Sequence, residues 1–274
     1  MSSVFGSLPR LIGVIHLPAL PGAPAVYGEL PDRVLQTAGA VAVREAALFK
    51  KAGFDGIIIE NFGDAPFYAE KVTPVTIAAF SVIASAVKET VRNLSVGINV
   101  LRNDAEAALS IAAVTGCDFV RINVLSGVAA TDQGLIQGKA AEWVRLRSQL
   151  GAPIQILADV FVKHAKTLHS DSLSDAIDDL SKRSGADGLI VTGAGTGKPV
   201  NTTNLDEMSA RCRKNQMPWY VGSGSSVDQL REIAIRGGGV IVGSSVRKGG
   251  VAGEKLEPAK VTAFVKAWKK AIKK

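Results

Sequence analysis

Two short runs of glycine and serine follow apolar segments near the end of the chain. They consist of Gly222, Ser223 and Gly224 in the first run and Gly243, Ser244 and Ser245 in the second. Glycine lets backbone N–H groups approach an anion closely, serine adds hydroxyl donors, and a following helix N-terminus adds its positive dipole. Neither run contains Lys or Arg. The pattern therefore predicts a phosphate cradle made largely of backbone amides.

A third glycine-rich run begins with Thr192, Gly193 and Gly195 and ends at Lys198. It is not a nucleotide P-loop, because its two outer glycines are one residue too close for the GxxxxGK[ST] spacing and a proline follows Lys198. We expect Thr192 to contact a substrate and the two glycines to assist the phosphate cradle.

Polar side chains also stand at the ends of earlier apolar segments, where a buried strand alone would favour apolar residues. They are His16, Glu60, Asn99, Arg121, Asn123 and Asp159. A carboxylate at the end of a strand is well placed for general acid/base work, so we predict Asp159 as acid or base with His16 or Glu60 as its partner.

Arg121 and Asn123 are two residues apart and so share one face of a strand. An arginine buried unpaired against helices would be costly, so we expect both to line the mouth of a barrel. Together with Asn99 they would orient a substrate or stabilise oxyanion charge. Lys163 and His164, in the segment after Asp159, are further predicted substrate contacts.

Each of these side chains also has a purely structural interpretation. His16 could pack on nearby prolines, Asp159 could cap the segment that follows it, and Glu60 could brace a loop.

Some chemistries are disfavoured by the residues present. No lysine lies within a predicted strand, so a Schiff-base nucleophile in the barrel interior is not expected. The three histidines lack the spacing of a zinc site, and neither Cys117 nor Cys212 sits in a metal-ligand motif. We predict no cofactor, although Asp159, Glu60 and a substrate phosphate could share a divalent cation.

Eight short aliphatic segments alternate with stretches of helical periodicity, which is typical of parallel βα units. The predicted strands are residues 11–17, 56–61, 95–101, 118–124, 154–159, 188–192, 219–222 and 240–243. The predicted helices are residues 38–52, 76–91, 104–115, 139–150, 173–184, 204–215 and 226–236, with a basic helix end at the C-terminus. We predict a single (β/α)₈ TIM barrel over residues 1–274. An open doubly wound sheet is the alternative, disfavoured because no GxGxxG follows the first strand.

The formal net charge is +7, and five of the lysines fall in the last nine residues. Because this run sits at a helix C-terminus, where it complements the dipole, we do not predict nucleic-acid binding.

No apolar run reaches the roughly 18 residues of a transmembrane helix, and residues 1–9 do not resemble a signal peptide. We expect a cytoplasmic protein, and the sequence is compatible with a homo-oligomer.

Several long blocks of the chain resemble the BtpA family. They are residues 11–18 (LIGVIHLP), 55–67 (DGIIIENFGDAPF), 97–104 (GINVLRND), 121–124 (RINV), 131–134 (TDQG) and 158–165 (ADVFVKHA). This resemblance implies a phosphate-binding TIM barrel related to the ribulose-phosphate-binding barrels. The family takes its name from a member needed for photosystem I accumulation at the photosynthetic membrane, and relatives occur in non-photosynthetic organisms.

Two hypotheses follow for the function. The first is an enzyme, of isomerase or lyase type, acting on a small phosphorylated sugar or nucleoside-like ligand. The second, implied by the resemblance, is a non-catalytic factor for photosystem I biogenesis that lies peripherally at a membrane.

Overall fold

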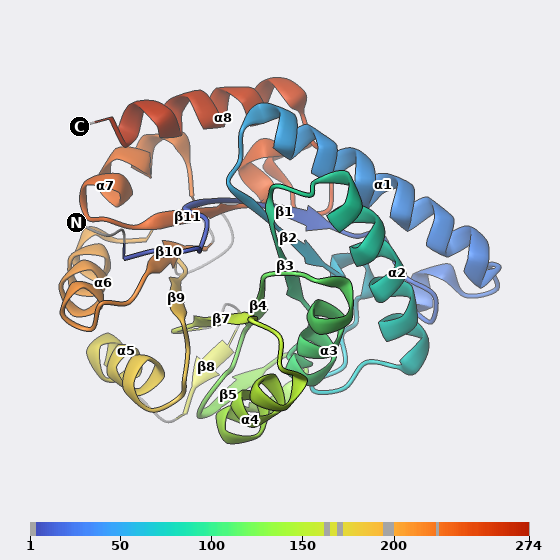
Figure 1. Ribbon diagram of the computed structural model, residues 1–274, viewed down its shortest axis with the longest axis horizontal. Helices are drawn as coiled ribbons and strands as arrows, with labels where there is room; N and C mark the ends of the chain where they lie inside the picture. Colours follow the sequence, from blue (N-terminus) through green and yellow to red (C-terminus); the bar gives the residue numbers. More distant parts are fainter. Residues whose placement is uncertain (1–3, 162–164, 169–171, 194–199, 223–224, 274) are drawn as a thin grey trace.

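Eight parallel strands close into a barrel, as expected from the sequence (Figure 1). The computed structural model describes residues 4–161, 165–168, 172–193, 200–222 and 225–273. In chain order the barrel strands are β1 (Leu11–His16), β2 (Gly56–Glu60), β3 (Ser95–Asn99), β4 (Phe119–Ile122), β7 (Gln155–Asp159), β9 (Gly188–Val191), β10 (Trp219–Val221) and β11 (Gly239–Val242). The ring closes where β1 pairs in parallel with β11. The TIM barrel prediction is confirmed.

Helices cover the outside of the barrel (Figure 1). They are α1 (Pro31–Ala52), α2 (Pro74–Thr90), α3 (Ala105–Thr115), α4 (Ala140–Leu150), α5 (Leu173–Lys182), α6 (Thr202–Lys214), α7 (Leu230–Ile235) and α8 (Pro258–Ala271). The first helix begins at Pro31 rather than at residue 38, because proline fits the first helical position. The helix predicted over residues 226–236 is a 3₁₀ turn, Val227–Gln229, followed by the short α7.

The barrel interior is a packed apolar core in its lower and middle layers. Side chains at alternate strand positions fill it, including Ile58, Phe119 and Tyr220. Phe119 occupies the space that a side chain at Gly97 would need, since a Cβ there would lie 2.2 Å from Phe119 Cε2. The interior cluster below the mouth is therefore closely packed and apolar except for the buried hydroxyl of Tyr220.

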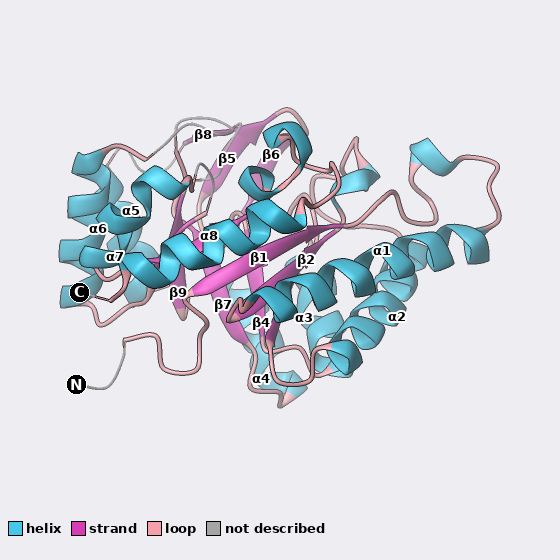
Figure 2. Cartoon of the chain, turned by 90° about the horizontal axis from the view of Figure 1, so that it is seen from above, coloured by secondary structure: helices cyan, strands magenta, loops and turns pink. Residues whose placement is uncertain are grey.

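A small antiparallel sheet in the order β6-β5-β8 was not predicted. Its strands β5 (Val128–Thr131) and β6 (Gly134–Gln137) lie between β4 and α4, and β8 (Ala165–Thr167) lies between β7 and α5. Figure 2 shows this sheet at one end of the barrel and the N-terminal segment at the other. Because these strands have only three or four residues, they are too short to show a clear alternation of apolar and polar residues.

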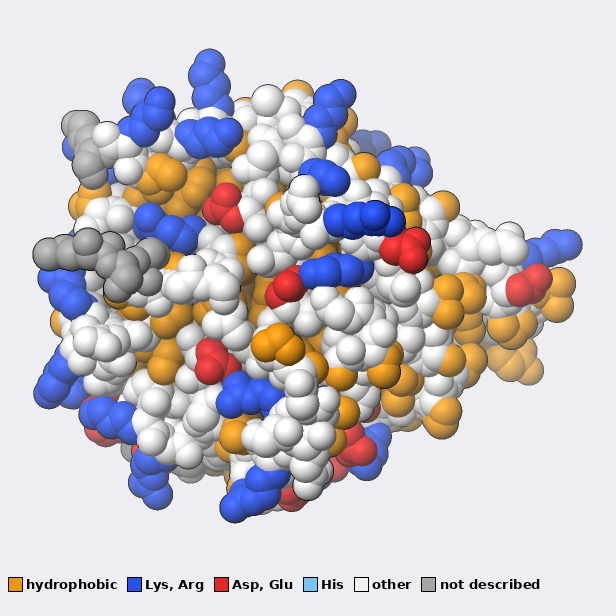
Figure 3. Space-filling view, in the orientation of Figure 1, with side chains coloured by type: hydrophobic (Ala, Val, Ile, Leu, Met, Phe, Trp, Pro, Cys, Tyr) orange, Lys and Arg blue, Asp and Glu red, His pale blue; other side chains and the backbone are white. Residues whose placement is uncertain are grey.

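The N-terminal segment seals the opposite end of the barrel, where Phe5 and Leu8 join the interior core. Figure 3 shows the face on which this segment lies. Lys and Arg side chains are spread around that face, with Asp and Glu between them. This scattering agrees with the absence of a basic stripe in the sequence.

A buried ion pair ties the segment after β11 to the rest of the fold. Arg247, which is only 1% exposed, contacts Glu45 of α1 through two hydrogen bonds of 3.0 and 2.8 Å. Its Nη2 also donates to the Val14 carbonyl of β1 at 2.9 Å. A single side chain thus fixes the loop that contains Gly243 against α1 and β1.

Replacing Arg247 should strongly destabilise the barrel. In Arg247→Met the Glu45 carboxylate stays buried without its partner, which should lower the free energy of unfolding by about 3–5 kcal/mol. The exposed pair Lys71–Glu106 supplies the control, because Lys71→Met should have far less effect. Urea denaturation measures both variants, and equal losses would contradict a special role for Arg247.

Candidate active site

Six polar side chains predicted from the sequence converge at the mouth of the barrel. This mouth layer consists of His16, Glu60, Asn99, Arg121, Asn123 and Asp159, which come from β1, β2, β3, β4 and β7. Each continues the inward alternation of its strand, as Glu60 follows Ile58 and Arg121 follows Phe119 by two residues. All except the half-buried Arg121 are buried. Arg121 and Asn123 lie on the same face, as their spacing predicts, and both contact Asp159.

Asp159 lies at the centre of one hydrogen-bonded group. Its Oδ1 accepts from Arg121 Nε at 3.3 Å and Nη2 at 3.1 Å, and its Oδ2 accepts from Nη2 at 3.0 Å and from Asn123 Nδ2 at 2.6 Å. Four contacts occupy all the lone-pair directions of a carboxylate. Burial disfavours the charge on Arg121, but the Asp159 and Glu60 carboxylates outweigh burial and raise the Arg121 pKa.

Glu60 forms a second and less saturated group. Its Oε2 accepts from Asn99 Nδ2 at 2.7 Å across the paired strands β2 and β3. Within the described part of the chain, Glu60 Oε1 has no hydrogen-bond donor, and neither has the buried Asn123 Oδ1. These two oxygens can therefore accept hydrogen bonds from hydroxyl groups of a ligand.

His16 is held in a defined orientation beside Glu60, with which it pairs in register. Its Nδ1 accepts from the Gly253 amide at 3.1 Å, and its ring packs on Phe62 with the centroids 4.6 Å apart. Since Nδ1 is an acceptor, the proton of the neutral ring lies on Nε2. A Cβ at Gly243 would lie 3.5 Å from that Nε2, so this edge of His16 faces the second glycine-serine loop.

The predicted phosphate residues border the mouth layer on the β9–β11 side. A Cβ at Gly222 would lie 3.8 Å from Arg121 Nη2 and 3.3 Å from Thr192 Cγ2. The Gly222 amide, however, donates to the Val191 carbonyl at 2.8 Å and so is not available to an anion. A Cβ at Gly222 would also lie 2.6 Å from Ile190 Cγ2, so the Ile190 side chain fills the space beside this glycine. Thr192 donates its hydroxyl to the Phe161 carbonyl at 3.1 Å.

Gly243 and the two serines after it lie at the start of a 3₁₀ turn. Gly243 caps the 3₁₀ turn Ser244–Val246, and the first amides of such a turn have no acceptor within it. Gly193 is buried directly after Thr192. The other predicted contacts, Lys163, His164, Gly195, Ser223 and Gly224, lie outside the described residues.

Arg102 was missed by the sequence reasoning. The charges that act on it include those of Asp159, Arg121 and Glu60, which places its guanidinium near the mouth layer. Burial lowers its pKa, although Asp159 and Glu60 oppose this. Its loop is held by the buried Asn61, whose Oδ1 accepts from the Leu101 amide at 2.7 Å. Because Arg102 lies past the end of β3, strand alternation gave no signal for it.

The donor set gives no support to a divalent cation. Asp159 is fully engaged by Arg121 and Asn123, so Glu60 is the mouth-layer carboxylate with an open oxygen. Among the described residues, no three or more His, Cys, Asp or Glu side chains are grouped as metal ligands.

Comparison with known proteins fixes the family. The model of the BtpA family matches residues 9–270. The chain belongs to the BtpA family. It is 41% identical over 96% of its length to the photosystem I biogenesis protein BtpA of Synechocystis, covering 89% of that protein. It is 46% identical to an uncharacterised protein of Pyrococcus horikoshii, with 88% of each chain covered, and 33% identical to a mitochondrial protein of Caenorhabditis elegans, with 95% and 93% covered.

Solved structures similar to this BtpA-family chain are TIM-barrel enzymes. Phosphoribosyl anthranilate isomerase from Thermus thermophilus aligns with a TM-score of 0.56 at 10% identity, over 95% of this chain and 98% of that one. 3-Keto-L-gulonate-6-phosphate decarboxylase from Vibrio cholerae aligns with a TM-score of 0.55 at 14% identity, over 96% and 97%. At these identities the likeness shows the fold.

No helix of the described residues is long and apolar enough to cross a membrane.

The tautomer of His16 in this BtpA-family barrel can be tested directly. Because Gly253 donates to Nδ1, neutral His16 should carry its proton on Nε2. Long-range ¹H–¹⁵N NMR distinguishes the two nitrogens, and His16→Gln assigns the signal among the three histidines. A neutral ring protonated on Nδ1 would contradict the arrangement described for this site.

Proposed function

We propose that this BtpA-family protein is an enzyme of isomerase or lyase type that acts on a small phosphorylated sugar or nucleoside-like ligand. The observation that carries the proposal is the mouth layer itself. Above an otherwise solid apolar interior it presents Glu60 with an open oxygen, the oriented His16 and the guanidinium of Arg121. Buried polar groups with unused hydrogen-bonding capacity are costly unless a ligand completes them.

The phosphate of the ligand would bind on the β11 side. The open space at Gly243, the first amides of the turn Ser244–Val246 and the Nε2 edge of His16 all face this position. Arg121 Nη2 lies 3.8 Å from the Cβ position of Gly222, so the cation can attract the anion from this side without being its direct ligand. Gly193 and Thr192 would border the same space.

The unphosphorylated part of the ligand would then lie over Glu60, Asn99 and Asn123. Asn123 Oδ1 and Glu60 Oε1 can accept from its hydroxyl groups. We assign proton transfer to Glu60, with His16 as its partner, because Glu60 has an open carboxylate oxygen. The four contacts of Asp159 favour a different role for that residue, namely holding Arg121 in place.

The structural neighbours support the phosphorylated ligand class. Two of them are named for enzymes of a phosphoribosyl compound and a sugar 6-phosphate, and another is a thiamine phosphate pyrophosphorylase from Pyrococcus furiosus. Barrels of this kind commonly place a phosphate at the loops after the last two strands.

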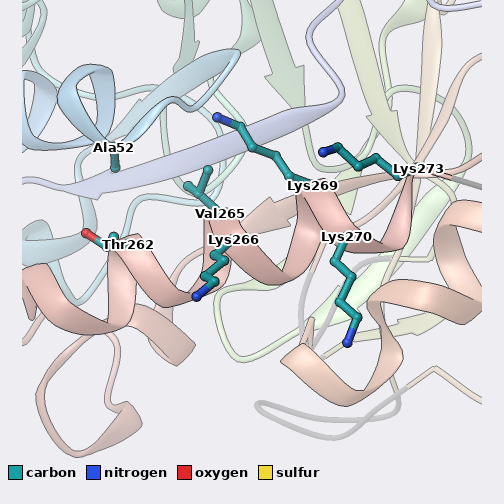
Figure 4. Close-up of a pocket in the computed structure, with 7 residues that line it drawn as sticks. All are labelled: Ala52, Thr262, Val265, Lys266, Lys269, Lys270 and Lys273. Carbon is teal, nitrogen blue, oxygen red and sulfur yellow. The ribbon is translucent and has the colours of Figure 1, made fainter.

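Photosystem I biogenesis is not favoured as the shared function of these proteins. Comparably similar relatives come from archaea and from a nematode, which have no photosystem. A peripheral membrane role would rest on the basic end of α8. The lysines of this end border a groove of about 580 Å³, shown in Figure 4, and they are Lys266, Lys269, Lys270 and Lys273. These lysines sit at the C-terminal end of α8, where they offset the helix dipole.

Phosphate binding at Gly243 can be tested with a thermal-shift screen of inorganic phosphate and sugar phosphates. A ligand at about 100 times its dissociation constant should stabilise the protein by about 2.7 kcal/mol. A Cβ at Gly243 makes only ordinary contacts, so Gly243→Ala should fold normally yet bind phosphate about tenfold more weakly by narrowing the cradle. Gly39→Ala in α1 is the matched control. Phosphate binding unchanged in Gly243→Ala would contradict the assignment.

Catalysis can be tested by proton exchange with solvent. In D₂O, the wild-type protein should exchange a carbon-bound proton of any sugar phosphate that stabilises it, as followed by ¹H NMR. Glu60→Gln should slow this exchange by about 10²–10⁴-fold and retain phosphate binding. If Glu60→Gln exchanged the proton at the wild-type rate, Glu60 would not be the proton-transfer residue. Asp159→Asn would then test whether Asp159 is the acid or base, as predicted from the sequence.

A further inference from the structure

A second hollow lies at the opposite end of the barrel from the mouth layer. It has a volume of about 370 Å³ and is bordered by the N-terminal segment and the ends of α6, α7 and α8. In Figure 3, hydrophobic side chains gather between α7 and α8 on this face, with Lys and Arg around them. The volume is within the range of about 300–1,000 Å³ typical of small-molecule sites. We call it the basal pocket.

The walls of the basal pocket are polar at Arg10, Ser209, Arg213 and Arg236 and apolar elsewhere. The apolar part includes Phe5, Met217 and Trp219, which are at most 9% exposed, and the exposed Ile272. Such walls exclude water from one side of a bound molecule and favour a compact apolar group. A highly charged, strongly hydrated ligand would lose that advantage.

Arg10 supplies a cation to this pocket that the protein itself does not neutralise. Its guanidinium lies 5.2 Å from the ring centroid of Phe5 and 5.5 Å from that of Trp268, and its Nη2 donates to the Gly238 carbonyl at 2.9 Å. In the described part of the chain Arg10 forms no ion pair, and its buried Nε has no acceptor. Burial lowers the pKa of Arg10 despite the field of Asp55.

The two other arginines of the pocket, Arg213 and Arg236, differ in whether a carboxylate pairs with them. Arg236 is already paired, since it contacts Asp206 at 2.7 Å and Glu232 at 2.6 Å. Arg213, at the end of α6, is exposed and forms no ion pair or hydrogen bond through its side chain among the described residues. None of the described residues that line the pocket is Asp or Glu. Arg10 and Arg213 therefore border the pocket without an ion-pair partner among the described residues.

We propose that the basal pocket binds a carboxylate with a compact apolar body, such as a medium-chain or aryl carboxylic acid. Its carboxylate lies between Arg10 and Arg213, and its apolar body packs on Phe5, Trp219 and Met217. A monoanion matches this pocket because one carboxylate satisfies a bidentate arginine, and because Phe5, Trp219 and Met217 form an apolar side for the rest of the molecule. This site is separate from the mouth layer and does not depend on the function proposed for it.

The test uses octanoate as the probe and the neutral octanamide as its isostere, with isothermal titration calorimetry on the full chain. Octanoate should bind, and octanamide should bind about tenfold more weakly for lack of charge. Ala271→Phe, which fills the pocket from the end of α8, should abolish octanoate binding at an unchanged melting temperature. Ala141→Phe, on the exposed face of α4, is its control.

A charge variant separates the pocket from general attraction by the basic surface. Arg213→Gln should weaken octanoate binding by up to about fivefold. Lys214→Gln removes the same charge from the next residue, which does not line the pocket, and should leave binding unchanged. Octanoate binding that survives in Ala271→Phe, equal affinity for octanamide, or equal effects of Arg213→Gln and Lys214→Gln would each overturn the proposal.

Discussion

The closed parallel barrel imposes one constraint on which the site depends, namely that every second side chain of each strand must point into a space of fixed width. Below the mouth this space is filled to contact, with Phe119 lying where a side chain at Gly97 would be. Phe5 and Leu8 close the bottom. Of the interior cluster below the mouth, Tyr220 alone carries a polar atom on its side chain, and the other members are apolar. Charged and amide side chains that face inward gather in the last layer. The mouth layer is the consequence.

Within that layer, charge compensation decides which groups remain available to a ligand. A buried arginine requires a carboxylate, and Arg121 takes both oxygens of Asp159. Asn123 adds a further donor to the same carboxylate, and its own buried oxygen has no donor among the described residues. Glu60 receives one amide donor from Asn99 and keeps one oxygen open. The two carboxylates are therefore chemically unequal although both end a strand, because their neighbours differ.

The alternation of residues along a strand is local, so the sequence alone predicted most of the mouth layer and the positions of all eight strands. Arg121 and Asn123 were placed on one face by their spacing alone. Three features depended on contacts between distant segments and could not be predicted. The ion pair of Arg247 joins residues 202 positions apart, Arg102 is positioned through Asn61 and a loop, and the Gly222 amide is taken by the neighbouring strand.

Arg10, at the base of the barrel, differs from Arg121 and Arg247 in having no carboxylate partner among the described residues. Arg121 and Arg247 each contact both oxygens of one carboxylate, and Arg247 also contacts backbone carbonyls. Arg10 is partly buried beside aromatic rings, yet its partners among the described residues are the Gly238 carbonyl and two π faces. Cation–π contact offsets only part of the desolvation of a guanidinium. The fold neutralises Arg121 and Arg247 with carboxylates but leaves Arg10 beside a hollow, and an anion entering from solvent is the partner that would restore the same balance there.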